Sequence, residues 1–246
     1  MEVKIKVAAV SYLNTKPLLY GIERSDLLDK MELVLEYPAQ LAQSLNEHKI
    51  DLALLPVAAI PGIAGARIIS DYGIAADGNV VSVALFSKVP LEQIRSVYLD
   101  YQSRTSVRLT RLLFAEYWRQ EVAFLPASED YIDHIEGDVA AVIIGDRALQ
   151  QLQHFPYVYD LSAAWKELTG LPFVFAAWVA NRELPADFVQ AFNAANAEGL
   201  QHLPEIAAAH PFPEYDLLTY YTENIHYRLD EDKKKGLHLF LEKIKE

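Results

Sequence analysis

Ser96-Val-Tyr-Leu-Asp-Tyr-Gln-Ser-Arg-Thr-Ser-Val-Arg-Leu-Thr-Arg-Leu-Leu-Phe-Ala-Glu-Tyr-Trp118 runs through three kinds of structure. It begins as a strand to Asp100, continues as a hydroxyl-rich loop from Tyr101 to Thr105, and has apolar residues at helical spacing from Ser106 onward. The first N–H groups of a helix have no partner within the helix, and the helix dipole makes that end positive. The stretch therefore predicts a site for a small anion such as a carboxylate.

The same order of strand, loop and helix recurs before and after this stretch. In the first series, we expect strands at Val3–Val10, Leu33–Tyr37 and Asp51–Pro56, with helices at Pro17–Ile22 and Ala39–Asn46. The second series has a strand ending at Asp100, a helix from Ser106, a strand near Ala123, a helix near Tyr131 and a strand at Asp138–Gly145. Further strands are predicted at Ile68–Tyr72, Val80–Phe86 and Leu171–Ala180, and helices at Phe188–Leu203, Tyr215–Asn224 and Glu231–Lys243.

One α/β series that is interrupted by a complete second series predicts two lobes. The expected fold class is α/β, a clamshell like that of type II periplasmic binding proteins, in which each lobe is a doubly wound sheet with flanking helices. Lobe I would comprise residues 1–87 and 178–246, and lobe II residues 88–177. Such folds bind ligands at the carboxyl ends of strands, between the lobes. The loops Ser11–Lys16 and Tyr101–Thr105 should therefore face one cleft.

The composition excludes several classes of function. The chain has 246 residues, of which 52% are hydrophobic, and a formal charge of −12 that disfavours binding to nucleic acid or anionic lipid. It has no cysteine, which excludes disulfides and thiolate metal sites. The first ten residues alternate too strongly for a signal peptide, and no run approaches the ~20 apolar residues of a membrane helix. We expect a cytoplasmic protein without nucleic-acid or membrane partners.

Motifs for metals and nucleotides are missing from the sequence. The seven histidines show no paired spacing of the kind that binds zinc or iron. Neither a Gly-x-Gly-x-x-Gly fingerprint nor a P-loop is present. We therefore predict no metal site and no nucleotide-binding site.

Six motifs in one order carry a family resemblance. They are Ser11-Tyr-Leu-Asn-Thr-Lys-Pro-Leu18, Asp51-Leu-Ala-Leu-Leu-Pro-Val57, Gly78-Asn-Val-Val-Ser-Val-Ala-Leu-Phe-Ser87, Ser103-Arg-Thr-Ser-Val107, Ile144-Gly-Asp-Arg-Ala-Leu149, and the stretch from Asp160 to Trp178. Together they resemble chorismate dehydratase of the futalosine route to menaquinone. The resemblance implies loss of water from chorismate to give 3-[(1-carboxyvinyl)oxy]benzoate, without a metal or organic cofactor.

A dianionic substrate such as chorismate needs two anion sites, and the two loops can supply them. The expected substrate-binding residues are Ser11, Tyr12, Thr15, Val57, Ser103, Arg104, Thr105, Ser106, Gly145 and Asp146. Arg104 would contribute only if its side chain folds inward. The competing interpretation of Ser103–Ser106 is an ordinary helix N-cap, which does not exclude binding.

The resemblance offers few ionisable groups for the elimination. Asn14 and Ser82 are the predicted catalytic residues, and both are neutral. One hypothesis is that the enolpyruvyl carboxylate of the substrate takes the C3 proton while these two residues hold it. The alternative makes Asp146 the base. As competing interpretations, Asn14 shapes the turn before Pro17, and Ser82 is a small strand residue bonded to backbone.

Two rival functions remain open at the level of the sequence. The first is the sister enzyme that forms 1,4-dihydroxy-6-naphthoate from cyclic dehypoxanthine futalosine, which should place a base such as histidine near the cleft. The second is a non-catalytic protein that binds a small carboxylate. A transport receptor should carry an export signal, and a regulator a helix-turn-helix segment, and we recognise neither. A homodimer is also left open.

Overall fold

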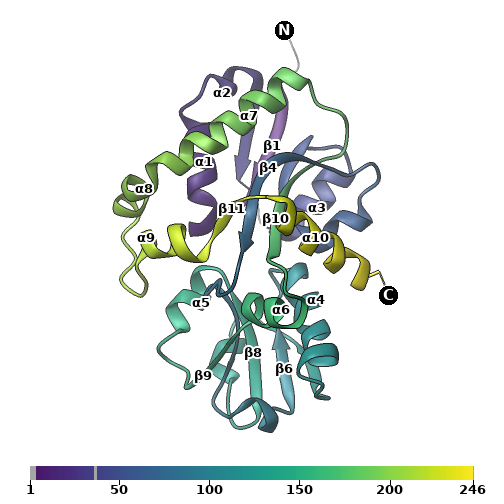
Figure 1. Cartoon of the computed structure of the whole chain (residues 1–246), viewed down its shortest axis with the longest axis vertical. Coiled ribbons are helices and arrows are strands. Elements are labelled where there is room, and N and C mark those ends of the chain that lie inside the picture. The colour runs from purple at the N-terminus through teal and green to yellow at the C-terminus, as the bar shows by residue number, and fades with distance from the viewer. Residues whose placement is uncertain (1–3, 36–37, 246) are drawn as a thin grey trace.

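Two β-sheets, one in each half of the molecule, organise the chain (Figure 1). In this computed structural model the described residues are 4–35 and 38–245. The predicted strand ends at Val3 and at Tyr37 therefore fall outside them. Each sheet is flanked by helices, so the α/β class with two lobes is confirmed.

The first sheet has six strands in the order β11-β4-β10-β3-β1-β2. Their bounds are β1 Ile5–Ala9, β2 Met31–Leu35, β3 Leu52–Pro56, β4 Arg67–Ala76, β10 Phe173–Ala180 and β11 His226–Arg228. Strands β1, β2 and β3 are parallel, whereas β10 runs antiparallel between β3 and β4. Strands β1 and β3 are almost wholly apolar and are covered on both faces. This burial explains why they lie in the parallel, central part of the sheet.

The second sheet has five strands in the order β7-β6-β8-β5-β9. Their bounds are β5 Val83–Ser87, β6 Ser96–Leu99, β7 Ala123–Pro126, β8 Val139–Ile144 and β9 Tyr157–Asp160. Strands β6, β7 and β8 are parallel, and β5 is antiparallel to both β8 and β9. Both sheets thus combine a parallel half with antiparallel strands.

The chain passes between the sheets twice, and these passages differ from the lobe boundaries that we predicted. Strand β5 was assigned to lobe I, but it pairs only with strands of the second sheet. Residues 173–177 were assigned to lobe II, but they belong to β10 of the first sheet. If lobes are defined by their sheets, the passages lie at residues 77–82 and 170–172. An apolar strand looks the same in either sheet, so only the pairing distinguishes them.

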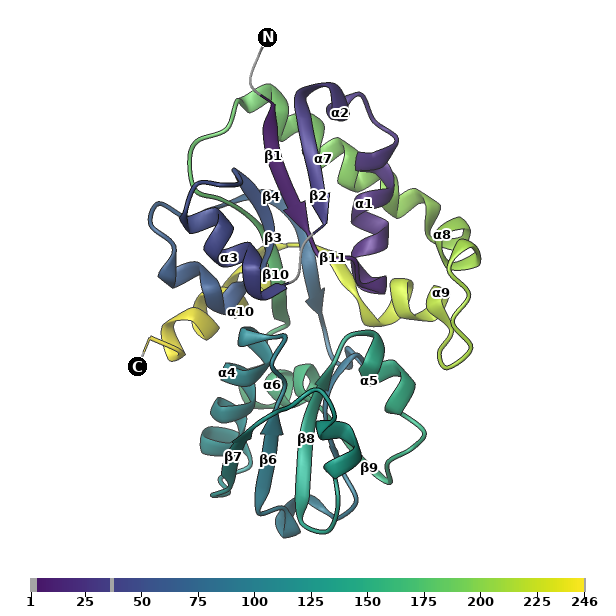
Figure 2. The same cartoon turned by 180° about the vertical axis from the view of Figure 1, so that it is seen from behind.

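Helices cover both faces of the sheets, as the doubly wound pattern predicts (Figures 1 and 2). The α-helices are α1 Lys16–Glu23, α2 Leu27–Lys30, α3 Pro38–Asn46, α4 Arg104–Leu112, α5 Asp146–Gln151, α6 Leu161–Thr169, α7 Ala186–Gly199, α8 Leu203–Ala209, α9 Leu217–Thr219 and α10 Glu231–Lys243. Short 3-10 helices lie at Leu13–Thr15, Val57–Gly62, Leu91–Gln93, Tyr131–His134 and Leu200–His202, and π-helices at Leu113–Tyr117 and Tyr220–Asn224.

Most expected helices are present, with differences at their ends. The helix expected from Ser106 begins at Arg104 because Ser103 caps it, and the helix expected near Tyr131 is only a 3-10 turn. The expected Phe188–Leu203 helix is α7, which leads through a 3-10 turn into α8. The C-terminal region was predicted to be wholly helical, but it also contains β11.

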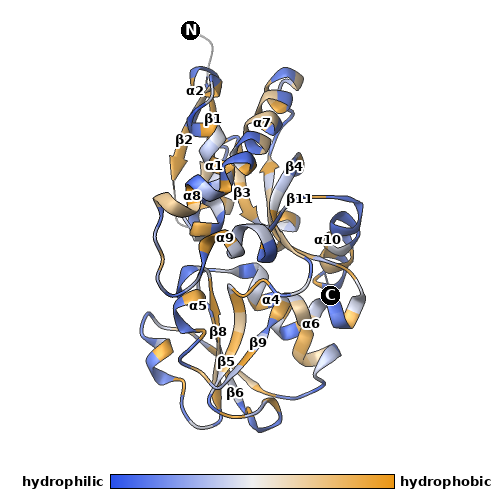
Figure 3. Cartoon of the chain, turned by 60° about the vertical axis from the view of Figure 1, so that its left-hand side comes forward, coloured by the Kyte–Doolittle hydropathy of each residue, from blue (hydrophilic) through white to orange (hydrophobic). Residues whose placement is uncertain are grey.

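Apolar residues concentrate in the strands and on the inner helix faces (Figure 3). The larger hydrophobic core is continuous across both halves, and a smaller cluster around Phe86 and Tyr131 lies in the second half. Trp165, Trp178 and Phe173 are fully buried in the larger core. No helix within residues 4–35 and 38–245 is both long enough and apolar enough to cross a membrane.

Candidate active site

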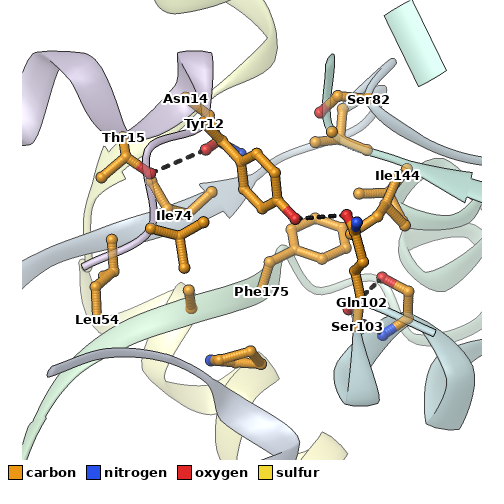
Figure 4. A pocket seen from close by; sticks show the side chains of 17 residues that line it. Tyr12, Asn14, Thr15, Leu54, Ile74, Ser82, Gln102, Ser103, Ile144 and Phe175 are labelled. Atoms are coloured by element: carbon orange, nitrogen blue, oxygen red, sulfur yellow. Dashed lines mark hydrogen bonds between the residues drawn. The ribbon is translucent and has the colours of Figure 1, made fainter. Parts of the chain in front are cut away.

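A pocket lies where parallel strands of both sheets end (Figure 4). The space within it is about 650 Å³ when the part open to solvent is included. The lining residues are Val10, Tyr12, Asn14, Thr15, Leu54, Pro56, Ile74, Val80, Ser82, Val83, Gln102, Ser103, Ser106, Ile144, Gly145, Phe175 and Ala176. They come from the loops after β1, β6 and β8, from the end of β3, and from β4, β10 and the passage before β5.

The polar lining is neutral. Among the described residues, no Asp, Glu, Lys, Arg or His side chain lines the pocket. The single ionisable group in the lining is the phenol of Tyr12, and burial raises its pKa to about 12, with a further contribution from the charge of Asp100. At neutral pH the pocket thus offers hydroxyl, amide and backbone donors to a ligand, but no charged side chain.

Helix α4 presents its N-terminal end to the pocket from the second sheet. The Ser103 side chain accepts a hydrogen bond from the backbone N–H of Ser106 at 3.1 Å, and the two hydroxyl oxygens lie 2.9 Å apart. Both side chains line the pocket and both are buried. Ser103 is therefore an N-cap as well as a pocket residue, and it places the positive end of the α4 dipole beside the pocket.

The loop after β1 faces α4 from the first sheet. The Tyr12 hydroxyl donates to Gln102 Oε1 at 2.7 Å, across 90 positions of sequence (Figure 4). Asn14 lies in the following 3-10 turn, where its Oδ1 accepts from the Thr15 hydroxyl at 3.3 Å. This turn leads directly into α1. The expectation that both loops reach one cleft agrees with this geometry.

Ser82 is held in place by its backbone. Its N–H donates to the carbonyl of Val80 at 2.7 Å, and its own carbonyl accepts from the N–H of Gly145 at 2.7 Å. The first contact closes a γ-turn around Val81, whose φ of +57° is a strained value for a β-branched residue. The Val81 N–H in turn donates to Asp160 Oδ2 at 2.7 Å. Strain that is supported in this way is typical of functional sites.

Gln102 lies next to a buried ion pair in the second half of the molecule. Its backbone N–H donates to Asp100 Oδ1 at 2.7 Å, and Asp100 Oδ2 accepts from Arg147 at 2.7 Å and from the Tyr131 hydroxyl at 2.8 Å. The Asp100 side chain is completely buried. The buried Asp100–Arg147 pair therefore holds the loop that carries Gln102 and Ser103 in place.

Seven of the twelve predicted site residues line the pocket: Tyr12, Asn14, Thr15, Ser82, Ser103, Ser106 and Gly145. The other five do not. Arg104 is exposed and contributes to two grooves outside the pocket, so its side chain does not fold inward. Thr105 accepts from the N–H of Ala58 at 3.1 Å, Val57 is fully buried, and the exposed Ser11 accepts from Lys16 at 3.2 Å.

Asp146, the fifth of these, connects the two halves of the molecule instead of lining the pocket. Its Oδ1 accepts from the backbone N–H of Leu13 at 3.2 Å. Burial raises the pKa of Asp146, while the Leu13 N–H and the charge of Lys16 oppose that shift. This placement favours a structural carboxylate that holds the Asn14 turn in position.

Sequence reasoning missed ten of the lining residues, of which Gln102, Phe175 and Ile74 are examples, and also Tyr220, which bonds Ser82. Gln102 lies within the loop Tyr101–Thr105, where the sequence already predicted an anion site. Its position next to Ser103 could therefore have identified it as a site residue. Phe175 and Ile74 belong to apolar strands and were indistinguishable from core residues. Tyr220, whose hydroxyl donates to Ser82 Oγ at 2.7 Å, comes from a distant C-terminal segment that no local pattern connects to the pocket.

Nowhere among the described residues do three or more His, Asp or Glu side chains gather in a way that could hold a metal ion.

Solved structures share the fold. A crystal structure of an Archaeoglobus fulgidus protein matches with a TM-score of 0.78 at 16% identity, covering 98% of this chain and 97% of that one. A Candida albicans protein described as having the generic periplasmic binding protein fold matches with a TM-score of 0.66 at 13% identity, covering 97% and 90%. These matches confirm the predicted periplasmic-binding-protein-like fold.

Sequence comparisons agree with the resemblance found in the motifs. A chorismate dehydratase from Thermus thermophilus is 30% identical over 266 aligned positions, which cover 95% of this chain and 92% of that protein. The sequence model of the family described as "Menaquinone biosynthesis" matches residues 5–246. The chain therefore belongs to the menaquinone biosynthesis family.

Proposed function

We propose that the protein is a chorismate dehydratase, a hydro-lyase that converts chorismate to 3-[(1-carboxyvinyl)oxy]benzoate and water in the futalosine route to menaquinone. The observation that carries this proposal is the neutral pocket, which has donor groups on two opposite sides. The similarity to a chorismate dehydratase over nearly the whole chain supports the same function.

The two groups of donors suit the two carboxylates of chorismate. On one side are the hydroxyls of Ser103 and Ser106 with the N-terminal end of α4, and on the other are Asn14 and Thr15 at the start of α1. Apolar side chains between them, including Phe175, can pack against the ring. Because none of the lining residues that the structure describes is a cation, hydrogen bonds and helix dipoles must hold the dianion.

The reaction requires little acid–base chemistry from the protein. The C3–H bond breaks and its electron pair completes the aromatic ring, while the C4–O bond breaks and hydroxide leaves. The C3 proton combines with this hydroxide as water, so the atoms balance without an oxidant or reductant. We propose that the enolpyruvyl carboxylate takes the C3 proton first, held by Asn14, while Ser82 donates to the developing charge.

The neutral lining also bears on the rival functions. The sister enzyme was expected to place a base such as histidine near the cleft, and none of the described lining residues is a histidine. Asp146 as base is disfavoured, because this carboxylate lies outside the lining and is bonded to Leu13. The cytoplasmic location and a homodimer remain predictions from the sequence.

Turnover of chorismate tests the proposal. Purified protein without added metal should consume chorismate, seen as loss of the ultraviolet absorption of its cyclohexadiene, and mass spectrometry should show a product lighter by one water. A parallel reaction with cyclic dehypoxanthine futalosine should give no naphthoate. Binding of chorismate without consumption would indicate a carboxylate-binding protein, and naphthoate formation would indicate the sister enzyme.

A further inference from the structure

Tyr220 is hydrogen-bonded to Ser82, one of the two neutral residues that we propose to be catalytic. It opens the π-helix Tyr220–Asn224, which follows α9 near the C-terminal end of the chain. Its side chain is completely buried, and its hydroxyl lies 2.7 Å from Ser82 Oγ, 138 positions away. Short π-helical segments are rare and occur frequently at functional sites.

The Tyr220 hydroxyl is a permanent hydrogen-bond donor. Burial raises its pKa well above the ordinary value for tyrosine, so it is protonated near neutral pH. Since Tyr220 donates to Ser82 Oγ, one lone pair of that oxygen is occupied. The backbone groups of Ser82 are bonded to Val80 and Gly145. Within the described residues, the hydroxyl hydrogen of Ser82 has no acceptor, so it can donate to a ligand.

Asn14 approaches the same phenol. Burial raises the Tyr220 pKa and outweighs the side chains of Ser82 and Asn14, which both lower it. Asn14 Oδ1 accepts from the Thr15 hydroxyl at 3.3 Å, which holds this side chain within its own turn. The hydrogen bond that fixes the phenol is the one to Ser82 Oγ at 2.7 Å. A buried donor of this kind polarises the hydroxyl that accepts from it.

We infer that Tyr220 is a positioning residue for the dehydration, which orients the Ser82 hydroxyl toward the substrate without touching the substrate itself. The inference rests on the proposed function. Tyr220 is absent from the pocket lining, so it acts through Ser82. Tyr220 comes after the chain has returned to the first sheet at residues 170–172. The C-terminal segment thus completes a site whose lining residues all lie before Ala177.

A matched pair of substitutions separates this role from simple packing. Tyr220→Phe removes the hydroxyl that bonds Ser82, whereas Tyr221→Phe removes a neighbouring hydroxyl that is buried and has no hydrogen-bond partner within the described residues. We expect kcat of Tyr220→Phe to fall roughly tenfold while KM stays near wild type. Tyr221→Phe should retain wild-type kcat, and thermal unfolding should show both variants folded.

A double-mutant cycle with Ser82→Ala completes the test. If Tyr220 acts through Ser82, adding Tyr220→Phe to Ser82→Ala should cause little further loss of kcat. Wild-type kcat in Tyr220→Phe, or losses that multiply in the double variant, would overturn the positioning role while leaving the dehydratase proposal intact. A wild-type protein that does not consume chorismate would overturn both.

Discussion

Tyr12 is the one side chain in the pocket lining, among the described residues, that can change its charge. Burial raises its pKa to about 12, so its protonation does not change near neutrality. We therefore expect kcat to be flat from about pH 6 to about pH 9, where both substrate carboxylates are ionised. Initial rates at saturating chorismate across this range provide the measurement.

Asp146 would give a different pH profile if it were the base. Burial raises its pKa, and only the ionised form accepts a proton, so activity would fall as the pH drops through that raised pKa. Asp146→Asn retains an oxygen that can accept from Leu13, and we expect it to lose less than about tenfold in kcat, whereas loss of a base costs roughly 10²- to 10⁴-fold. An acid limb that disappears in Asp146→Asn would contradict our assignment.

Helices α1 and α7 determine where the Asn14 turn lies. They cross at two glycines, and a Cβ atom added at Gly199 would come within 1.9 Å of the carbonyl oxygen of Pro17, in the first turn of α1. Asn14 and Thr15 immediately precede α1. A shift of α1 relative to α7 would therefore also move these two residues in the pocket.

Gly199→Ala should therefore destabilise the protein and disturb the site. Overpacking of this kind costs about 1–3 kcal/mol, so thermal unfolding should show a melting temperature lower by several degrees. Gly62→Ala is the matched control, because a Cβ atom there meets nothing within 4 Å. Equal melting temperatures for the two variants would contradict this view of the α1–α7 contact.

Most elements could be predicted from periodicity; the nine-residue helix α6 was not predicted, and the other exceptions are short. The predicted bounds of α10, Glu231–Lys243, agree with the structure because Asp230 caps its first turn and basic residues follow. By contrast, β9 has four residues and β11 has three, which is too few for alternation to be recognised. Their strand character comes from neighbours in the sheets and not from their own sequence.

The candidate site was predictable where polar residues follow strands, and hidden where apolar residues line it. Asn14, Ser103 and Ser106 could be found because parallel strands end at one edge of each sheet. Phe175 belongs to an apolar strand, and Tyr220 reaches Ser82 only through tertiary packing. Long-range contacts of this kind depend on the assembly of both halves of the molecule.

The charge of the whole molecule opposes its proposed substrate. The chain carries −12 and the substrate is a dianion, so long-range repulsion should slow their encounter. We expect kcat/KM to rise as ionic strength increases from about 20 mM to about 200 mM, because salt screens this repulsion. The control is kcat at saturation, which should change little. A fall in kcat/KM with salt would instead indicate that a local positive potential dominates the approach.

The central claim is that chorismate reacts in the neutral pocket between the two sheets, with Asn14 in contact with it. The most direct measurement is kcat of Asn14→Ala at saturating chorismate, with binding and thermal unfolding followed in parallel. We predict a loss of roughly 10²- to 10³-fold in kcat in a folded protein that still binds chorismate. Full turnover by this variant would contradict the account.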